Sequence, residues 1–338
     1  MILFDSIYIH EGGGKTILNI LISNIIENNL DDYFFIIDER YSNDLVKKIS
    51  KEKLVVLTSS ELSRRNFYLK NHKKFNTFFC LANVPPPIFI KNKKVIVYFQ
   101  NELLLNSNPF HLKSLMLWIK RLYISLLKQS NYKWVVQTNL MKDKLVKHLK
   151  ISNNSIKIFP IFPKLKKVNN FSGHTQKFIY VASGEDHKNH LRLLHSMNVT
   201  SNKLDKPIHL YLTLTENKFK NLMKRSHVDN SKLVVKNLGL LKQDVLYEKY
   251  SELGYLIYPS LYESFGLPLI EAAQLDLVII ASDLPYVNEI ISSYYSFDPL
   301  DINDISLSIE KVINSRSPIT SILKIKSEET ALINYIND

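Results

Sequence analysis

Two glutamates in the second half of the chain have the spacing and the surroundings of a sugar-binding pair. In the segment ESFGLPLIE, seven residues separate Glu263 from Glu271. The segment follows a predicted strand that ends at Tyr258, and Pro268 suits the first position of a helix. A carboxylate one turn into that helix can accept hydrogen bonds from a vicinal diol such as ribose, and Glu263 can bind sugar hydroxyls in the same way. The alternative for Glu271 is a structural carboxylate that the helix dipole stabilises by about 0.3 to 1 kcal/mol.

The main chain between these glutamates is predicted to bind phosphate. Amide groups at the start of a helix lack partners within the helix, and the helix dipole favours an anion beside them. The residues that would supply such amides directly after Glu263 are Ser264, Phe265, Gly266 and Leu267. Together with the two carboxylates, they predict a site for a phosphorylated sugar or nucleotide.

A run of three glycines is the second candidate for phosphate binding. The chain has 8 glycines, and Gly12, Gly13 and Gly14 lie between a predicted strand at 2–9 and a predicted helix at 15–28. Residues without side chains permit close approach of a ligand, and helix-start amides favour phosphate. The segment is similar to a P-loop, but that pattern requires glycine at position 9, where the chain has Ile9. A tight turn without a ligand is the alternative.

The composition indicates a globular protein of two domains. The chain has 338 residues, of which 45% are hydrophobic and 22% are charged. The sequence shows neither an apolar run of eighteen residues nor a signal peptide, so we predict a cytoplasmic protein that does not span a membrane. The only cysteine, Cys80, lies in an apolar run and is interpreted as a core residue. A disulfide framework or a cysteine metal site within one chain is therefore excluded.

Positive charge is concentrated in one part of the chain. Residues 51–150 contain 19 Lys and Arg against 4 Asp and Glu, whereas residues 251–300 contain none against 7. This asymmetry indicates an anionic partner, namely a nucleic acid, a phosphorylated substrate or an anionic lipid surface. The alternative is a solvated surface without a partner.

Alternating strand-like and helix-like segments predict two Rossmann-like α/β domains. Short runs rich in β-branched and aromatic residues recur in both halves, with helix-compatible stretches between them. Prolines, lysines and polar residues interrupt this rhythm at about residues 160–175. We therefore predict domains at 1–165 and 170–315, and a helical segment at 316–338 that packs back on the first domain. Because ligands bind beyond the carboxyl ends of parallel strands, a cleft between the domains is the expected site.

These features resemble the retaining nucleotide-sugar glycosyltransferases of family 4, which have the GT-B fold of two facing Rossmann-like domains. The resemblance spans nearly the whole chain and rests on the Glu263–Glu271 motif, the glycines at 12–14 and the segments 135–145 and 180–194. It implies that Glu263 contacts the donor sugar and Glu271 the ribose of the nucleotide. It also implies an acceptor-side domain at 1–165 and a nucleotide-sugar donor domain at 170–315.

The resemblance assigns the diphosphate to one lysine. Lys188 corresponds to the phosphate-binding lysine of the family, and the arginine that usually accompanies it is absent from residues 182–184. Neutralisation of the diphosphate would then depend on Lys188, the glycines at 12–14 and the amides after Glu263, with help from His187.

Two further positions take roles from the same resemblance. Many members have a histidine near the donor sugar where this chain has Gln100 and Asn101, and we take Asn101, with Glu263 and Lys188, as a catalytic candidate. Gly239 matches the turn beside the nucleobase, although an ordinary turn between strand and helix is the alternative.

The implied reaction moves a sugar from a nucleoside-diphosphate sugar to a hydroxyl of a glycan or lipid-linked glycan. The resemblance implies retention at C1 and a role in surface polysaccharide biosynthesis of the O-antigen or capsule type. Because the sequence has no Asp-x-Asp triplet, we predict no metal, and no other cofactor is expected. His187 and His190 lack a third clear ligand and are interpreted as solvated or capping residues. The alternatives are a nucleotide-sugar epimerase of the same fold and a nucleotide- or nucleic-acid-binding protein; the transferase interpretation needs no nucleic acid.

Residues 112–128 predict a basic amphipathic helix. Lys113, Lys120, Arg121 and Lys128 fall within about 100° of one another on a helical projection, which leaves a broad apolar face. Such a helix can rest on the anionic inner face of a cytoplasmic membrane, close to a lipid-linked acceptor. The alternative is an ordinary helix whose apolar face packs on a sheet.

Overall fold

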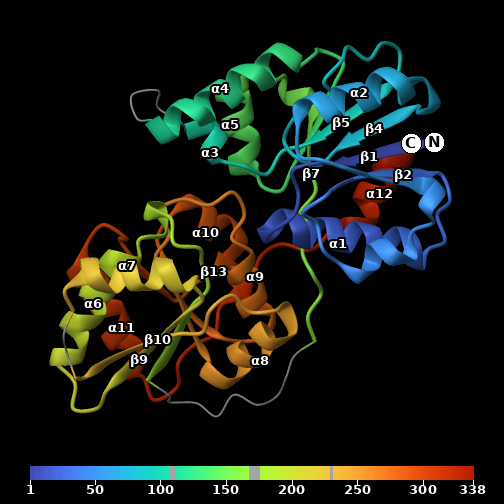
Figure 1. Ribbon diagram of the computed structural model, residues 1–338. Coiled ribbons are helices and arrows are strands. Elements are labelled where there is room, and N and C mark those ends of the chain that lie inside the picture. Colours follow the sequence, from blue (N-terminus) through green and yellow to red (C-terminus); the bar gives the residue numbers. More distant parts are fainter. Residues whose placement is uncertain (107–111, 167–175, 229–230) are drawn as a thin grey trace. The chain divides into compact units, whose positions relative to one another are not determined.

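A computed structural model describes residues 1–106, 112–166, 176–228 and 231–338. They form two compact units (Figure 1). Unit 1 comprises Met1–Pro163 and Lys326–Asp338, and unit 2 comprises Lys164–Ile325. The chain thus passes from unit 1 to unit 2 within the proline- and lysine-rich stretch that interrupts the sequence pattern.

Unit 1 is built on a parallel sheet with the strand order β3-β2-β1-β4-β5-β6-β7. Its strands are β1 (Ile2–Ser6), β2 (Tyr33–Asp38), β3 (Leu54–Leu57), β4 (Thr77–Cys80), β5 (Lys94–Tyr98), β6 (Lys133–Val136) and β7 (Ile156–Ile158). Its α-helices are α1 (Gly12–Glu27), α2 (Glu61–Asn71), α3 (Leu103–Asn106), α4 (Leu112–Leu127), α5 (Asn139–Leu149) and α12 (Glu329–Asn337). Strand β1 pairs with both β2 and β4 and is buried along its whole length, as a central parallel strand requires.

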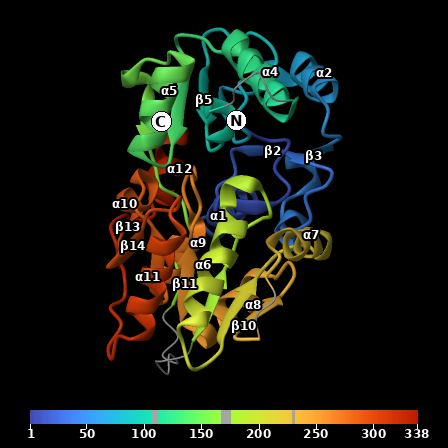
Figure 2. The same ribbon diagram turned by 90° about the vertical axis from the view of Figure 1, so that its left-hand side faces the viewer.

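Helices cover both faces of this sheet. Side chains alternate along β1, so Phe4 joins the core beneath α1 and α12, while Leu3 joins the core beneath α2, α4 and α5. Burial of each such side chain stabilises the fold by roughly 1.5 to 3 kcal/mol. Helices α2 and α4 lie beside one another on the second face (Figure 2), where the Tyr123 hydroxyl donates a hydrogen bond to Glu61 at 2.5 Å.

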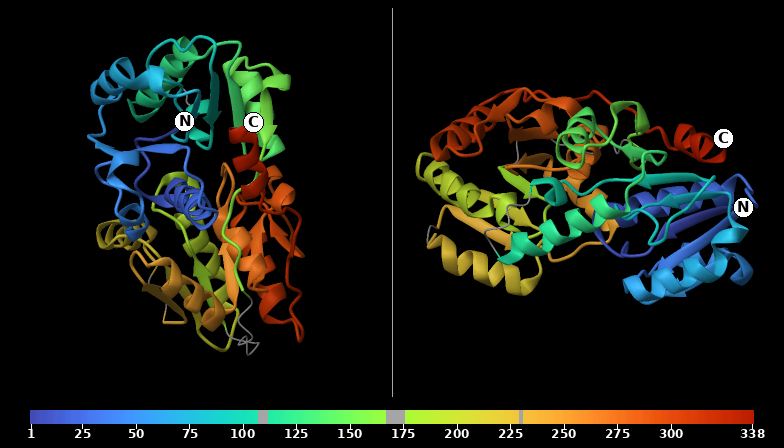
Figure 3. Two further views of the ribbon diagram at one scale, coloured as in Figure 1. Left: turned by 90° about the vertical axis from the view of Figure 1, so that its right-hand side faces the viewer. Right: turned by 90° about the horizontal axis from the view of Figure 1, so that it is seen from above.

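The last helix, α12, belongs to unit 1, where Figure 3 shows it in red. Its apolar residues in the core are Leu332, Ile333 and Ile336. The Tyr33 hydroxyl donates a hydrogen bond to Asn337 at 2.9 Å and ties the helix end to β2. Residues 316–325, in contrast, lie in unit 2, where β15 (Ile322–Leu323) pairs in antiparallel fashion with β13 (Ile291–Ser292).

A buried ion pair anchors α2 to the sheet of unit 1. The Arg64 Nε donates to Asp5 Oδ2 at 2.8 Å, and the Tyr68 hydroxyl donates to the same oxygen at 2.7 Å. Both charged side chains are almost completely buried, at 2% and 1% exposure. Cys80 is buried beside them, as its apolar surroundings in the sequence predict, and burial raises the pKa of its thiol to about 12.

Unit 2 contains a second parallel sheet, with the order β10-β9-β8-β11-β12-β14. Its strands are β8 (Lys177–Tyr180), β9 (Ile208–Leu212), β10 (Leu233–Asn237), β11 (Tyr255–Tyr258), β12 (Val278–Ser282) and β14 (Tyr295–Phe297). Its α-helices are α6 (His190–Asn202), α7 (Glu216–Ser226), α8 (Gln243–Leu253), α9 (Leu267–Gln274), α10 (Pro285–Ile290) and α11 (Ile302–Ile313). The segments that follow the carboxyl ends of β8, β10 and β11 carry the predicted site residues of this unit.

Candidate active site

The first glutamate of the motif lies in the loop between β11 and α9. Gly266 is the N-terminal cap of α9 and has a φ of +76°, a conformation in which a side chain would be strained. Helix α9 begins at Leu267, so Pro268 occupies its second position rather than the predicted first. Proline is tolerated in the first turn of a helix, because an amide there has no hydrogen-bond partner within the helix. Gly266 and Pro268 together therefore mark the start of α9 in the sequence.

Lys188 and Glu263 meet in unit 2. The Lys188 ammonium nitrogen lies 2.6 Å from Glu263 Oε1 and 2.8 Å from Oε2, so it contacts both oxygens of the carboxylate. The exposed fractions of the two side chains are 13% and 12%. The Tyr258 hydroxyl, at the end of β11, donates to Glu263 Oε1 at 2.9 Å. Two residues that the sequence singles out separately thus form one ion pair.

The backbone around Lys188 is held by buried polar contacts. Lys188 ends a short 3₁₀ helix (Asp186–Lys188), and its carbonyl oxygen accepts a hydrogen bond from the Tyr180 hydroxyl at 2.7 Å. The next residue, Asn189, has a φ of +62°. Its side-chain amide donates to the carbonyl oxygens of Pro259 at 3.2 Å and Pro299 at 2.7 Å. Loops that follow three different strands are therefore joined at this point.

The second glutamate of the motif is buried in α9. Glu271 is 5% exposed, and its carboxylate accepts hydrogen bonds from the hydroxyls of Tyr250 at 3.3 Å and Tyr247 at 3.5 Å, both on α8. Burial raises the pKa of Glu271 to about 7, although hydrogen bonds from Tyr250, Tyr247 and Gln243 act in the opposite direction. This carboxyl group therefore changes its charge near neutral pH.

The two histidines near Lys188 have different surroundings. The His187 ring stacks on Tyr262 with a centroid distance of 4.6 Å, and burial together with the Lys188 charge lowers the pKa of His187. His190 is 6% exposed and packs against Tyr180, so of the two predicted roles, solvated or capping, the solvated one is wrong. Burial lowers its pKa to about 4, and the ring is neutral at physiological pH.

The other predicted site residues of unit 2 are Ser264, Phe265, Leu267 and Gly239. The Phe265 side chain is buried in the interior of unit 2, while Ser264 and Leu267 are partly exposed. Gly239 follows β10 with a φ of +71°, and the turn alone accounts for a glycine at this position.

The predicted residues of unit 1 lie at the carboxyl edge of its own sheet. Gly12–Gly14 form the first turn of α1 rather than a loop before it, and Gly12 has a φ of +61°. A Cβ on Gly14 would lie 3.0 Å from Gln100 Nε2, so these two residues are in close contact. Asn101 accepts a hydrogen bond from the main-chain nitrogen of Leu103 at 3.0 Å and thereby stabilises the turn into α3.

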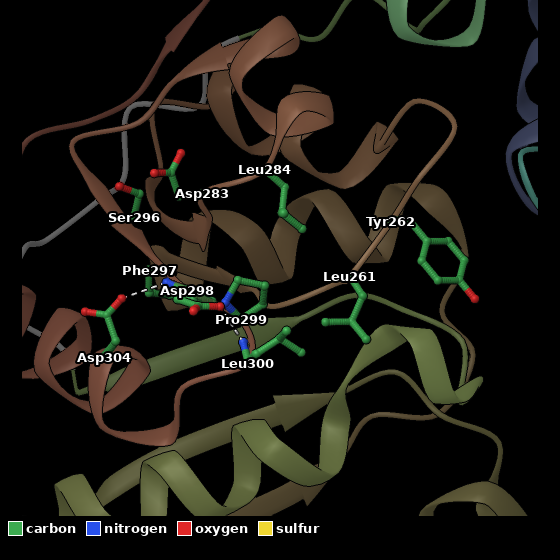
Figure 4. Close-up of a pocket in the computed structure, with 10 residues that line it drawn as sticks. All are labelled: Leu261, Tyr262, Asp283, Leu284, Ser296, Phe297, Asp298, Pro299, Leu300 and Asp304. Carbon is green, nitrogen blue, oxygen red and sulfur yellow. Dashed lines mark hydrogen bonds between the residues drawn. The ribbon is translucent and has the colours of Figure 1, made fainter. Parts of the chain in front are cut away.

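A hollow of about 500 Å³ lies beside the loop that carries Glu263 (Figure 4). It is lined by Leu261, Tyr262, Asp283, Leu284, Ser296, Phe297, Asp298, Pro299, Leu300 and Asp304. Three carboxylates and no lysine or arginine are among these described residues, and Asp304 accepts a hydrogen bond from the main-chain nitrogen of Asp298 at 2.7 Å. Because carboxylates repel phosphate, this hollow does not suit an anionic ligand.

Comparisons with known proteins identify the family. The family described as "Glycosyl transferases group 1" matches residues 161–329, which are half of the chain. The chain belongs to this family of glycosyltransferases. No match was found among curated proteins.

Solved structures of glycosyltransferases share the fold. Anabaena HepE, crystallised with UDP and glucose, has a TM-score of 0.66 at 12% identity, with 93% of this chain and 90% of HepE covered. The lipopolysaccharide outer core galactosyltransferase WaaB has a TM-score of 0.63 at 15% identity, with 99% and 94% covered. TarM has a TM-score of 0.55 at 17% identity. The match covers 75% of this chain but only about half of TarM, 51%. The two parallel α/β units and these neighbours confirm the predicted GT-B fold.

Membership of this family favours the glycosyltransferase interpretation over the epimerase and nucleic-acid alternatives. The sequence did not reveal the tyrosines that hold the glutamates of this glycosyltransferase: Tyr258 for Glu263, and Tyr247 and Tyr250 for Glu271. Tyr258 could have been found, because it ends the strand directly before the motif. The α8 tyrosines could not, since only the packing of α8 against α9 brings them to Glu271.

Proposed function

We propose that this glycosyltransferase moves a sugar from a nucleoside-diphosphate sugar to a hydroxyl of a glycan or lipid-linked glycan, with retention at C1. The proposal rests on Lys188 and Glu263 beside the start of α9, with Glu271 one turn further into the helix. An ammonium group and helix-start amides suit a diphosphate, and carboxylates suit sugar and ribose hydroxyls. HepE with UDP-glucose and a TarM variant from S. aureus with UDP and α-GlcNAc-glycerol support the substrate class.

The chemistry requires stabilisation of a leaving group. The bond between C1 of the sugar and the β-phosphate oxygen breaks, and that oxygen keeps the electron pair. The acceptor oxygen forms the new bond to C1, and its proton passes to the departing phosphate, so the reaction needs no protein base. The Lys188 ammonium and the amides after Glu263 would stabilise the negative charge on the phosphate, because they are fixed before the reaction starts.

The proposed metal independence and biological role have their own support. The lack of an Asp-x-Asp triplet favours transfer without a divalent cation, so chelation with EDTA should leave the rate unchanged. WaaB and WaaG are described as lipopolysaccharide enzymes, which supports a role in surface polysaccharide synthesis. The roles of Asn101 and Gly12–Gly14 stay predictions, since these residues lie in unit 1.

A thermal-shift panel of UDP-, GDP-, ADP- and dTDP-sugars tests the donor site. A ligand that binds the native state raises the melting temperature, and we expect one nucleotide class to do so. Lys188→Gln should abolish the shift. Lys218→Gln is the matched control, because Lys218 forms an exposed ion pair with Glu185 in the same unit, with an N–O distance of 2.7 Å. No shift with any nucleotide sugar, or equal shifts in both variants, would contradict the proposal.

We also propose that α4 rests on an anionic membrane surface close to a lipid-linked acceptor. Of its side chains from Leu115 onward, Ile124 is buried and Leu117 packs partly against the core of unit 1. Five large apolar side chains of α4 are exposed, by 37% to 82%: Leu115, Met116, Ile119, Leu122 and Leu126. The side chains of residues 112–114, Lys113 among them, lie outside the described part of the chain.

Helix α2, beside α4, also exposes apolar and basic side chains. Helix α2 exposes Leu62 and Leu69, and Arg65 and Lys120 are exposed on α2 and α4. Because only part of the apolar surface of α4 packs against the core of unit 1, the alternative of an apolar face packed on the sheet does not account for the exposed residues. An exposed apolar face with adjacent cations suits the interface of an anionic bilayer. None of the helices in the described residues has the length and apolar character to cross a bilayer.

Vesicle flotation tests the membrane proposal. The protein should float with vesicles of phosphatidylcholine and phosphatidylglycerol, and less with phosphatidylcholine alone. The double change Ile119→Ser and Leu122→Ser should abolish flotation. Leu307→Ser serves as the control, because Leu307 is exposed to a similar extent, 57%, on α11 of unit 2. Equal flotation with both vesicle types, or an unaffected double variant, would refute the proposal.

A further inference from the structure

The only cation that the sequence assigns to the diphosphate is already engaged. Glu263 holds the Lys188 ammonium through both carboxylate oxygens at 2.6 and 2.8 Å, with little exposure of either side chain. The Tyr258 hydroxyl also donates to Glu263 Oε1, at 2.9 Å, and Tyr258 is buried. The pair has no net charge, so a diphosphate that approaches it meets an ammonium group whose field is largely cancelled.

Neighbouring cations are bound to other groups. Arg192 donates to Asn189 at 2.6 Å and to the carbonyl oxygen of Pro299 at 3.3 Å, and Lys218 pairs with Glu185. Residues 251–300 contain no lysine or arginine. A diphosphate that uses the Lys188 ammonium must therefore draw it away from Glu263.

The nucleotide sugar and the free nucleoside diphosphate differ in what they offer Glu263. A bound sugar presents hydroxyls that donate hydrogen bonds to the carboxylate and replace the ammonium group. After transfer these hydroxyls are gone, and the terminal phosphate, no longer an ester, carries close to one additional negative charge at neutral pH. The carboxylate then repels the product and takes Lys188 back.

We infer that Glu263 is a specificity-determining residue that makes the site bind nucleotide sugar in preference to free nucleoside diphosphate, by competing with the diphosphate for Lys188. The inference rests on the proposed function. Its consequence is release of the nucleoside diphosphate after each transfer, without a separate gate.

Calorimetric titration of Glu263→Gln tests the inference. The amide keeps the shape of the side chain and can still accept the Tyr258 hydrogen bond, but it cannot hold the ammonium group by charge. With the nucleotide of the best-binding sugar donor, we expect Glu263→Gln to bind the nucleoside diphosphate at least about tenfold more tightly, which equals about 1.4 kcal/mol. The affinity for the nucleotide sugar should fall, because a charged acceptor is lost.

Two controls show whether the gain runs through Lys188. Glu185→Gln, which frees Lys218 instead, should leave both affinities unchanged. In the double variant Lys188→Gln, Glu263→Gln the gain should disappear, as a double-mutant cycle requires for two coupled groups. Unchanged or weaker diphosphate binding by Glu263→Gln would overturn the inference, and so would a gain that survives in the double variant.

A measurement on the unaltered protein is independent of how the variants fold. The nucleotide sugar should bind more tightly than the nucleoside diphosphate, although it carries less charge, and the reverse order would overturn the inference. If neither ligand binds the unaltered protein, the proposed function fails as well. If the nucleotide sugar binds but Glu263→Gln does not gain affinity for the diphosphate, only the inference fails.

Discussion

Replacement of Glu271 by glutamine should make unit 2 more stable at alkaline pH and weaken donor binding. The pKa of Glu271 in the folded protein is raised by burial from 4.5 to about 7. The folded state therefore retains the proton over a range in which the unfolded chain has lost it. The stability that this proton provides is fully present below pH 4.5 and is lost as the pH rises through about 7.

The magnitude follows from the size of the shift. At about 1.4 kcal/mol per pKa unit, the change from 4.5 to about 7 corresponds to about 3 kcal/mol. Because part of the loss has occurred by about pH 5, the unfolding free energy of unit 2 should fall by about 2 to 3 kcal/mol between about pH 5 and about pH 8 through this residue alone. Glu271→Gln lacks a titrating group and should not show this fall, so it becomes the more stable protein at the higher pH.

The assay must separate the two units. Both tryptophans, Trp118 and Trp134, lie in unit 1, so tryptophan fluorescence in urea reports on unit 1 and should not respond to the change. Amide hydrogen exchange of α9 (Leu267–Gln274) reports on unit 2 at both pH values. Donor affinity should fall at least about tenfold, because an amide replaces a charged acceptor for the ribose hydroxyls. The same pH dependence in both proteins would refute the assignment of a buried, uncompensated carboxyl group.

Three further changes test the fold. Gly12→Ala should cost unit 1 about 1 to 2 kcal/mol in a urea titration, because the φ of +61° is strained for alanine, and Gly12→Asn should cost less. Arg64→Met should cost unit 1 about 3 to 5 kcal/mol in the same titration by leaving Asp5 charged and buried, and adding Asp5→Asn should recover part of the loss. Asp301→Ala should cost unit 2 about 1 kcal/mol by exchange measurements, since Asp301 caps α11 through the main-chain nitrogen of Asn303 at 2.8 Å.

Local patterns predicted most of the sheet strands but not the short ones. Runs such as 33–38 are long, apolar and rich in aromatic and β-branched residues, and they coincide with β2 and its counterparts. The sequence pattern does not reveal strands β7 and β14, because each has only three residues. The middle residue of each, Lys157 or Ser296, is polar and exposed. Such short segments become strands only because a longer neighbour supplies hydrogen-bond partners.

The glycine run shows how tertiary structure overrides local preference. Three glycines are poor helix formers, so the sequence predicts a turn with the helix starting at residue 15. In the structure they form the first turn of α1, where a Cβ on Gly14 would lie 3.0 Å from Gln100 Nε2 and from Ile9 Cδ1, so a side chain there would require these neighbours to shift. The sequence shows that small residues are needed at this place but not which neighbour requires them.

The contact between Lys188 and Glu263 could not be predicted from the sequence. Lys188 and Glu263 are 75 residues apart, and each was chosen for a separate role toward the ligand. Their mutual contact depends on the adjacency of β8 and β11 in the sheet, which brings the loops after both strands together. Strand order within a parallel sheet is a property of the whole unit, and no local motif encodes it.

Two buried carboxylates, Asp5 and Glu271, differ in whether a cation lies beside them. Asp5 lies next to a guanidinium group and a tyrosine hydroxyl, so its charge is compensated within unit 1. Without Asp5, Arg64 would keep the more distant Glu61 carboxylate, at 3.6 Å. Among the described residues, the hydrogen-bond partners of Glu271 are neutral, and the raised pKa records the cost of that environment. Folding alone would favour an apolar side chain at this place, or a cation beside the carboxylate. The proposed function would account for a carboxyl group at a place where it destabilises the fold, because the ribose hydroxyls of the donor would add hydrogen bonds to it.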